Sequence, residues 1–339
     1  MKQIDIVCTI GPSSWDPNIL EAMMKNGMTV ARFNGAFIDL PEMDRVGNLI
    51  RRIAKENNFK VRLLLDIKGH ELRLNKFHEE YAVNKGDTFL IGSKSDHKVF
   101  PVTYPDLYKV IKPGRVIKIN KGAVALQVQS IDYIEGIIIT EVISRGIIKG
   151  GKGMNVPSTY LENLPITDID LEQISYAIDN DWEIIAGSFI RNSTDVQVIK
   201  NSIEELKNQQ NKGSYNYQFI AKIEDQFGIS NLEEILDNVD GVMIARGDMS
   251  AEIGYERIPA VQIDMLDQIQ SKSRYSIVAT EMLESMLEDH LPSNADVADI
   301  VLAIKQGADA IMLSGETAFG NFPVECVEVM SKLIYEYSN

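Results

Sequence analysis

Short apolar segments, each followed by a stretch of helical periodicity, recur along most of the 339-residue sequence. Segments that are apolar on nearly every residue indicate strands buried on both faces of a parallel sheet. Eight strand–helix units favour a closed (β/α)₈ TIM barrel, an α/β fold, over an open sheet. The predicted strands are Asp5–Thr9, Thr29–Phe33, Val61–Asp66, Glu183–Phe189, Gln218–Ile223, Gly241–Ala245, Ser276–Thr280 and Ala310–Leu313. The predicted helices include Asn18–Lys25, Asp168–Ile178, Asn231–Leu236, Ala295–Lys305 and Pro323–Tyr335.

The alternation of strand and helix is interrupted between about Leu74 and Gly153. This interval has turn signals at Gly86, Gly114 and Gly122, and its apolar segments are β-branched without a helical period. We therefore expect residues 74–153 to form a small inserted β-barrel domain, a lid. The barrel domain would then consist of residues 1–73 and 154–339, with the lid over its mouth.

Charge and cysteine content exclude several classes of protein. The net charge of −15 disfavours binding to nucleic acid and to anionic membranes. It also means that a small anionic substrate requires a metal ion or a cationic pocket. The two cysteines, Cys8 and Cys326, form no zinc motif or disulfide framework. Met1–Val7 shows no signal region, and no apolar stretch reaches the roughly 18 residues of a membrane span. We expect a cytoplasmic protein.

Oxygen ligands and cations gather at the carboxyl ends of the predicted strands, where a barrel carries its active site. These ends contain no histidine, so they favour Mg²⁺ or Mn²⁺ over zinc. The residues at the strand ends are Thr9–Pro12, Arg32–Asn34, Asp66–Lys68, Ser188–Arg191, Lys222–Glu224, Ala245–Asp248, Thr280–Glu281 and Ser314–Glu316.

Two of these ends predict a metal site most directly. Lys222 and Glu224 are two residues apart and so face the same side of their strand. Glu224 and Asp248 could together hold one Mg²⁺ ion and leave its other positions to water and substrate. Gly247 lets backbone N–H groups approach a substrate carboxylate. A single strand-end carboxylate is more often a helix cap or a surface ion pair, but the two together favour a metal.

Motifs spaced along nearly the whole chain resemble those of the pyruvate kinase family. Their order and their position at successive barrel strands make the resemblance highly specific. Besides the two motifs around Lys222 and Asp248, they are Cys8–Ser14, Leu65–Gly69 with Glu71 and Arg73, Lys152–Pro157, Ser188–Arg191, Ala279–Met286 and Met312–Ala318.

The resemblance implies roles around a three-carbon acid. Lys222 would contact the transferring phosphoryl group and the enolate, which the divalent metal on Glu224 and Asp248 also stabilises. The backbone at Ala245, Gly247 and Asp248 would receive the substrate carboxylate. Thr280 would lie by the methylene carbon that gains a proton. Taken alone, the Thr280 hydroxyl is more simply explained by a hydrogen bond to the backbone.

The resemblance also implies a nucleotide side and a monovalent-cation site. Arg32 would contact the phosphoryl group, with Pro12 and Lys152 near the nucleotide and Arg73 and Glu71 supporting the site. A pairing of Arg32 with Asp66 is the purely structural alternative. Asn34, Asp66 and the Ile67 carbonyl are the candidate ligands of a K⁺ ion.

Several residues depart from the usual family motifs, mainly near the nucleotide and the cation. Ala36 and Phe37 replace a serine and a histidine, Lys121 replaces an aspartate in the lid, and Glu281 replaces a glutamine. Met249-Ser250, Leu291 and Asn294 are further departures. Because the chain ends soon after Tyr335, we expect the family's C-terminal regulatory domain to be missing.

The leading hypothesis is Mg²⁺-dependent phosphoryl transfer between phosphoenolpyruvate and a nucleoside diphosphate such as ADP, giving pyruvate and ATP. One alternative is an enzyme that uses the same metal–enolate centre with another acceptor or for C–C bond chemistry. A second alternative is a non-catalytic binding protein, against which the retained Lys222, Glu224, Asp248 and Thr280 argue. A homo-oligomer formed through the barrel helices is a candidate assembly.

Overall fold

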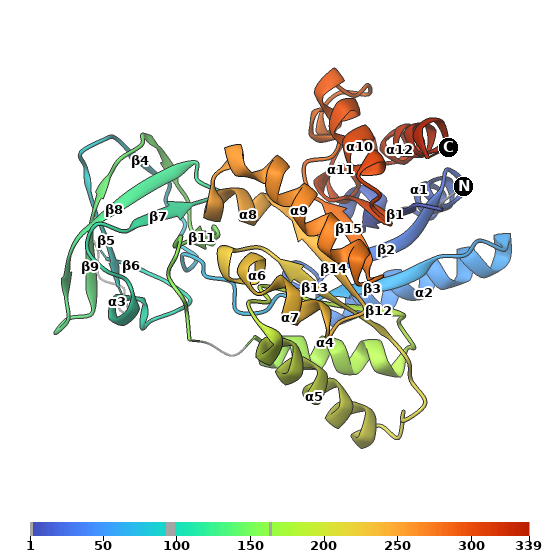
Figure 1. Cartoon of the computed structure of the whole chain (residues 1–339), viewed down its shortest axis with the longest axis horizontal. Coiled ribbons are helices and arrows are strands. Elements are labelled where there is room, and N and C mark those ends of the chain that lie inside the picture. The colour runs from blue at the N-terminus through green and yellow to red at the C-terminus, as the bar shows by residue number, and fades with distance from the viewer. Residues whose placement is uncertain (1–2, 93–98, 163–164, 339) are drawn as a thin grey trace.

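Eight parallel strands close into a barrel in the computed structural model, which describes residues 3–92, 99–162 and 165–338 (Figure 1). The strands are β1 (Asp5–Thr9), β2 (Met28–Asn34), β3 (Arg62–Asp66), β12 (Ile184–Gly187), β13 (Gln218–Ile223), β14 (Gly241–Ala245), β15 (Tyr275–Ala279) and β16 (Ala310–Leu313). They pair in the order β1-β16-β15-β14-β13-β12-β3-β2, and β2 pairs with β1 to complete the ring. The predicted closed barrel is confirmed.

Two strands end before their predicted limits. β12 ends at Gly187, because Phe189 has a φ of +52°. β15 ends at Ala279, because Thr280 has a φ of +73°. A left-handed residue cannot continue the extended ladder of a strand. Both turns redirect the chain at the mouth of the barrel. Phenylalanine and threonine rarely adopt a left-handed conformation, so its presence here marks a functional region.

The outer helices begin mostly at residues whose side chains cap them. Asp16 accepts hydrogen bonds from the first turn of its helix, and Thr167 and Ser293 each form a reciprocal capping box. No helix in the described part of the chain is long and apolar enough to cross a membrane. The helices are α1 (Pro17–Lys25), α2 (Leu40–Asn57), α4 (Asp168–Asp179), α5 (Ser193–Gln209), α6 (Gln226–Ser230), α7 (Leu232–Leu236), α8 (Arg246–Ile253), α9 (Ile258–Ser271), α10 (Asn294–Lys305), α11 (Gly315–Ala318) and α12 (Pro323–Tyr337).

The apolar core of the barrel has an inner and an outer part. Alternate residues of each strand point to opposite faces. On β13, Phe219 and Ala221 pack outward against the helices, whereas Ile220 packs inside the barrel. This division explains why the strands are apolar on nearly every residue. It also fixes which polar residues at the strand ends turn toward the barrel axis.

The inserted segment forms a separate β structure beside the barrel, with its own apolar cluster (Figure 1). One six-stranded sheet has the order β11-β7-β8-β9-β5-β6, and β10 pairs with β4. Leu72 and Val156, just outside the predicted limits 74–153, pack in the same cluster. The domain boundaries themselves stay a prediction. The elements are β4 (Tyr81–Val83), β5 (Thr88–Gly92), β6 (Val99–Pro101), α3 (Leu107–Val110), β7 (Val116–Ile119), β8 (Val124–Asp132), β9 (Ile137–Val142), β10 (Gly146–Ile148) and β11 (Met154–Asn155).

Candidate active site

A layer of polar side chains closes the carboxyl end of the barrel interior. On β2, β3 and β13 the inner apolar residues are Val30, Leu64 and Ile220. Because side chains alternate, the residues two positions later face the same interior. Those residues are Arg32, Asp66 and Lys222, and Thr9 and Ser188 follow Val7 and Ala186 in the same way. All five are at most 8% exposed, so the layer is buried beneath the mouth.

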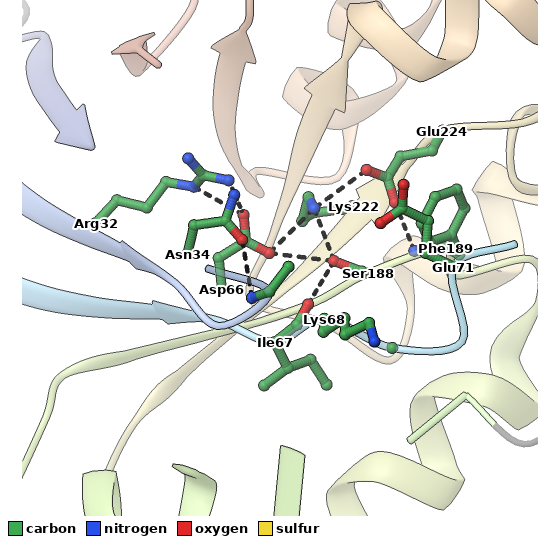
Figure 2. A network of polar contacts seen from close by, with 12 residues as sticks. Arg32, Asn34, Asp66, Ile67, Lys68, Glu71, Ser188, Phe189, Lys222 and Glu224 are labelled. Carbon is green, nitrogen blue, oxygen red and sulfur yellow. Dashed lines mark hydrogen bonds and ion pairs between the residues drawn. The ribbon is translucent and has the colours of Figure 1, made fainter. Parts of the chain in front are cut away.

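Asp66 is the central acceptor of this layer (Figure 2). Its Oδ2 receives the Arg32 Nε at 2.7 Å and Arg32 Nη2 at 2.6 Å, and its Oδ1 lies 3.0 Å from Lys222 Nζ. Burial alone would raise the pKa of Asp66, but the two cations outweigh it and lower that pKa. The pairing of Arg32 with Asp66, considered above as the structural alternative, is therefore present. It leaves Asp66 ionised and Arg32 fixed.

Lys222 is held by three acceptors at once. Its Nζ lies 3.0 Å from Asp66, 3.1 Å from Glu224 Oε1 and 2.7 Å from the Ser188 hydroxyl oxygen. Burial acts to lower the pKa of Lys222, but the carboxylates of Asp66 and Glu224 raise it overall. The ammonium group is therefore charged, desolvated and fully directed, as a group that neutralises developing negative charge needs to be.

Glu224 and Asp248 are the predicted metal ligands. Glu224 is 3% exposed, and one of its oxygens accepts the Phe189 N–H at 2.7 Å. Burial raises the pKa of Glu224 to about 7; Lys222 opposes this rise, and the carboxylates of Asp248 and Asp66 add to it. The site thus has more buried negative charge than its cations compensate. A divalent cation between Glu224 and Asp248 would correct this, so the donor set fits Mg²⁺.

Two carboxylates alone would not fill a magnesium coordination sphere. Among the residues that the structure describes, no three His, Cys, Asp or Glu side chains lie together as a metal cluster. Mg²⁺ keeps several water or substrate oxygens and is usually held by one or two carboxylates. The small number of protein ligands therefore agrees with an ion shared with a substrate. The assignment of Glu224 and Asp248 as ligands stays a prediction.

The amino end of α8 opens directly into the mouth after Ala245. The Gly247 N–H donates to the Thr280 hydroxyl oxygen at 2.9 Å. Beneath it, Arg246 anchors the turn by donating to the Thr280 carbonyl at 2.5 Å and to Asp299 at 2.8 Å. Since a helix amino terminus attracts anions, this arrangement can receive a substrate carboxylate. The expected backbone hydrogen bond of the Thr280 hydroxyl is present and leaves its hydrogen free to donate.

Arg73 and Glu71 connect the barrel mouth to the lid. Arg73 donates to Glu71 at 2.7 Å and to the Gly151 carbonyl at 2.8 Å. Burial raises the pKa of Glu71, with Arg73 opposing the rise and Asp248 adding to it. The remaining predicted residues, Pro12 and Lys152, lie outside the buried network. Pro12 begins a 3₁₀ turn, and Lys152 lies in the exposed segment before β11. Their roles stay predictions.

Ser188 is predicted only as a strand-end and motif residue without an assigned role, yet it lies at the centre of the network. Its single hydroxyl hydrogen lies between the Ile67 carbonyl, 2.6 Å from the hydroxyl oxygen, and Asp66 at 3.1 Å, and the hydroxyl oxygen accepts from Lys222. The sequence feature that indicates this position is the spacing of two residues from Ala186, which lies on the inner face of β12. Its role is to position Lys222 and Asp66.

A cavity beside the lid hinge contains a second carboxyl with an unusual environment. Its lining includes Asn155, Phe189, Asp225, Phe227 and Glu252, together with the polar residues His70, Thr159, Ser188 and Arg191 and several apolar residues. Burial raises the pKa of Glu252 to about 7 from an ordinary 4.5, and the Asp225 carboxylate adds to the rise. Its hydrogen bond with Asn155 acts in the opposite direction. The folded protein therefore favours the protonated form of Glu252.

We expect Glu252→Gln to stabilise the protein at alkaline pH. Above pH 7 the native carboxylate is ionised at a cost of up to about 3 kcal/mol relative to an exposed carboxyl, and glutamine removes that cost. The gain should shrink as the pH falls through 7 and vanish below the ordinary value of 4.5. Urea unfolding at several pH values measures this gain in stability. Glu21→Gln, on the exposed face of α1, is the control. An equal gain at every pH would contradict the assignment.

Comparison with known proteins places the chain in a family. The family profile described as "Pyruvate kinase, barrel domain" matches residues 1–327. The chain belongs to the pyruvate kinase family. It is 38% identical to a pyruvate kinase of Sporosarcina psychrophila over 98% of its own length and 56% of the relative's. It is 34% identical to one of Clostridium acetobutylicum over its full length and 71% of the relative's. The chain thus spans little more than half of most of these relatives.

This chain also closely resembles a solved pyruvate kinase in its fold. A crystal structure of a pyruvate kinase from Cryptosporidium parvum superposes with a TM-score of 0.92 at 32% identity. The match covers 98% of this chain and 68% of that one. Both the barrel and the lid are therefore features of the pyruvate kinase family rather than of this chain alone.

The predicted K⁺ ligands are in contact with donors of the protein. The Asn34 side-chain oxygen accepts the backbone N–H of Ala36 at 3.1 Å. The Ile67 carbonyl accepts the Ser188 hydroxyl, and both Asp66 oxygens receive cations. Each candidate oxygen thus has a protein donor. The Phe37 ring is exposed and lies 5.5 Å from the Arg73 guanidinium carbon, a cation–π contact.

Proposed function

We propose that this chain carries out pyruvate kinase chemistry: Mg²⁺-dependent phosphoryl transfer between phosphoenolpyruvate and a nucleoside diphosphate. The observation that carries the proposal is the buried ammonium group of Lys222, fixed between Asp66 and Glu224 at the mouth of the barrel. Phosphoryl transfer depends mainly on positioning and on neutralising charge, and this network provides both. Membership of the family supports the same reaction.

In this reaction an oxygen of the diphosphate attacks the phosphorus of phosphoenolpyruvate. The bond from phosphorus to the enol oxygen breaks, and its electron pair remains on that oxygen. Lys222 keeps its contacts with Asp66 and Ser188. The N–H of its ammonium group that contacts Glu224 turns toward the negative charge that develops on the enol oxygen. Arg32, fixed by two bonds to Asp66, faces the phosphoryl group. The new bond yields a nucleoside triphosphate.

The three-carbon acid is held at the amino end of α8. Its carboxylate binds at the amino end of α8 around Gly247 and Asp248, where it shares the Gly247 N–H with the Thr280 hydroxyl oxygen. The methylene carbon of the enolate then gains a proton on the side of Thr280, whose hydroxyl hydrogen is free because its oxygen accepts the Gly247 N–H. The product is pyruvate. Glu224 and Asp248 would hold the metal, and Mg²⁺ bound there would supply the positive charge that stabilises the transferring phosphoryl group and the enolate.

The proposal predicts pyruvate release from phosphoenolpyruvate only when Mg²⁺ and a nucleoside diphosphate are both present. The assay compares ADP, GDP, UDP and CDP, each with and without K⁺. The K⁺ series shows whether the protein-bonded oxygens of Asn34, Asp66 and Ile67 still admit the ion. Calorimetric binding of phosphoenolpyruvate without turnover on any of the four acceptors would contradict the proposal.

A second function is favoured by the residues that depart from the family motifs. The exposed ring of Phe37, which lies against the Arg73 guanidinium, changes the side of the site that faces the acceptor. The same metal–enolate centre could then serve another phosphoryl acceptor or C–C bond chemistry. Phosphate release or consumption of phosphoenolpyruvate with a non-nucleotide acceptor would favour this reading. The cytoplasmic location and an assembly through barrel helices stay predictions.

A further inference from the structure

The turn between β7 and β8 projects from the lid toward the barrel mouth in an unusual backbone conformation. Asn120, Lys121 and Gly122 all have positive φ angles, of 54°, 56° and 90°. Only the glycine adopts such an angle without a steric penalty. The turn is fixed at its base, where the Asn120 N–H donates to the Gly153 carbonyl at 2.9 Å. The lid therefore holds Lys121 in a conformation that a lysine rarely adopts.

Lys121 lies directly over the substrate end of α8. Its Nζ is 3.5 Å from Glu281 Oε1 on the barrel side. A Cβ placed on Gly247 would be 3.2 Å from that Nζ and 3.6 Å from the Thr280 hydroxyl oxygen. The ammonium group, the Thr280 hydroxyl and the helix amino terminus thus converge above one backbone position. Three donors of this kind define an anion-binding site.

The ion pair alone does not account for this arrangement. The side chains of Lys121 and Glu281 are 55% and 46% exposed, and an exposed pair at this distance contributes little to stability. Both residues are nonetheless held at positive φ, Glu281 at 57°. Such strain persists where a site requires it. A lid that needed only to stay closed has a less strained contact in the Lys118 ammonium, which donates to the Ala251 carbonyl at 2.6 Å.

The charge around the mouth supplies the reason for a lid cation. The Asp248 carboxylate lies close enough to act on both Glu71 and Glu224, and the carboxylates of Glu281 and Glu316 act in the same way on Glu284, so negative charge accumulates around the mouth. An anionic substrate entering this region meets repulsion that one metal ion only partly offsets. A lysine brought by the lid adds positive charge where a carboxylate is expected to bind.

We propose that Lys121 is a further substrate-binding residue, whose ammonium group binds the carboxylate of the three-carbon acid above Gly247. Glu281 holds the lysine over the site when no substrate is present, and the carboxylate replaces Glu281 when substrate binds. Lys121 and Glu281, which both depart from the family motifs, are thereby explained together as one exchangeable ion pair. This inference rests on the proposed function, because it assumes a phosphoenolpyruvate-type ligand.

Calorimetric titration of phosphoenolpyruvate and oxalate in Mg²⁺ tests the role of Lys121 without requiring turnover. Lys121→Met should weaken binding of both acids about tenfold, whereas Lys121→Arg should keep most of it. Glu281→Gln should strengthen binding, because it removes the competing acceptor. Lys109→Met is the matched control: Lys109 on α3 forms an exposed ion pair with Asp106 just before that helix, and α3 lies away from α8 (Figure 1).

The outcomes separate the roles of the two residues. Opposite shifts for Lys121→Met and Glu281→Gln support the proposal. Equal losses in both variants would show a lid latch and overturn it, as would binding by Lys121→Met within twofold of the parent. A parent that binds phosphoenolpyruvate but transfers no phosphoryl group defeats the proposed function while Lys121 is still tested. A parent that binds neither acid defeats both.

Discussion

Replacement of Lys222 by methionine is expected to lower the turnover number about a thousandfold, while the protein remains folded. Methionine preserves most of the side-chain volume but removes the charge that we propose to face the phosphoryl group. The three bonds from Lys222 to Asp66, Glu224 and Ser188 disappear together. Steady-state rates of pyruvate formation measure the loss. Circular dichroism of the same sample shows that the barrel persists.

Lys207→Met is the matched control for this prediction. Lys207 is 8% exposed, like Lys222, but it lies on α5 and pairs with Glu204. It should lose less than about twofold in turnover, since it touches no group of the mouth. Similar losses in both variants would mean that burial of a lysine, rather than its position in the network, limits activity.

Much of the site could be predicted because strand geometry translates directly into position. The two-residue spacing of Lys222 and Glu224 places both on one face, and the structure joins them at 3.1 Å. The order of the strand ends likewise follows from the closed barrel. The same rule, applied to Ala186, would have identified Ser188 as part of the inner layer.

Other features depend on contacts that no local pattern encodes. The left-handed residues Phe189 and Thr280, which end β12 and β15, are ordinary strand formers in sequence. Their conformations are imposed by the network: Phe189 donates its N–H to Glu224, and Thr280 accepts from Gly247. The meeting of Lys121 with Glu281, 160 residues later, requires the placement of the lid on the barrel.

Asp66→Asn is expected to cost about 3–5 kcal/mol of stability at neutral pH. Asp66 is 1% exposed and is the carboxylate that pairs with Arg32, itself only 6% exposed. An amide keeps the shape but leaves the guanidinium without a charged partner, whereas Lys222 retains Glu224. Because the pKa of Asp66 is lowered, its contribution is present above the ordinary value of 3.8 and is lost only in acid. Urea unfolding of the metal-free protein at neutral pH measures the cost.

A double-mutant cycle shows whether this cost arises because the Arg32 guanidinium is left without a charged partner. Arg32→Met should also destabilise the protein, because it leaves Asp66 with one cation fewer. The double variant Arg32→Met/Asp66→Asn should lose less than the sum of the two by about 1–3 kcal/mol, since no unpaired guanidinium or carboxylate then remains between these positions. Strictly additive losses would show that the two residues act independently. The buried layer would then owe its stability to packing and not to the ion pair that fixes Arg32.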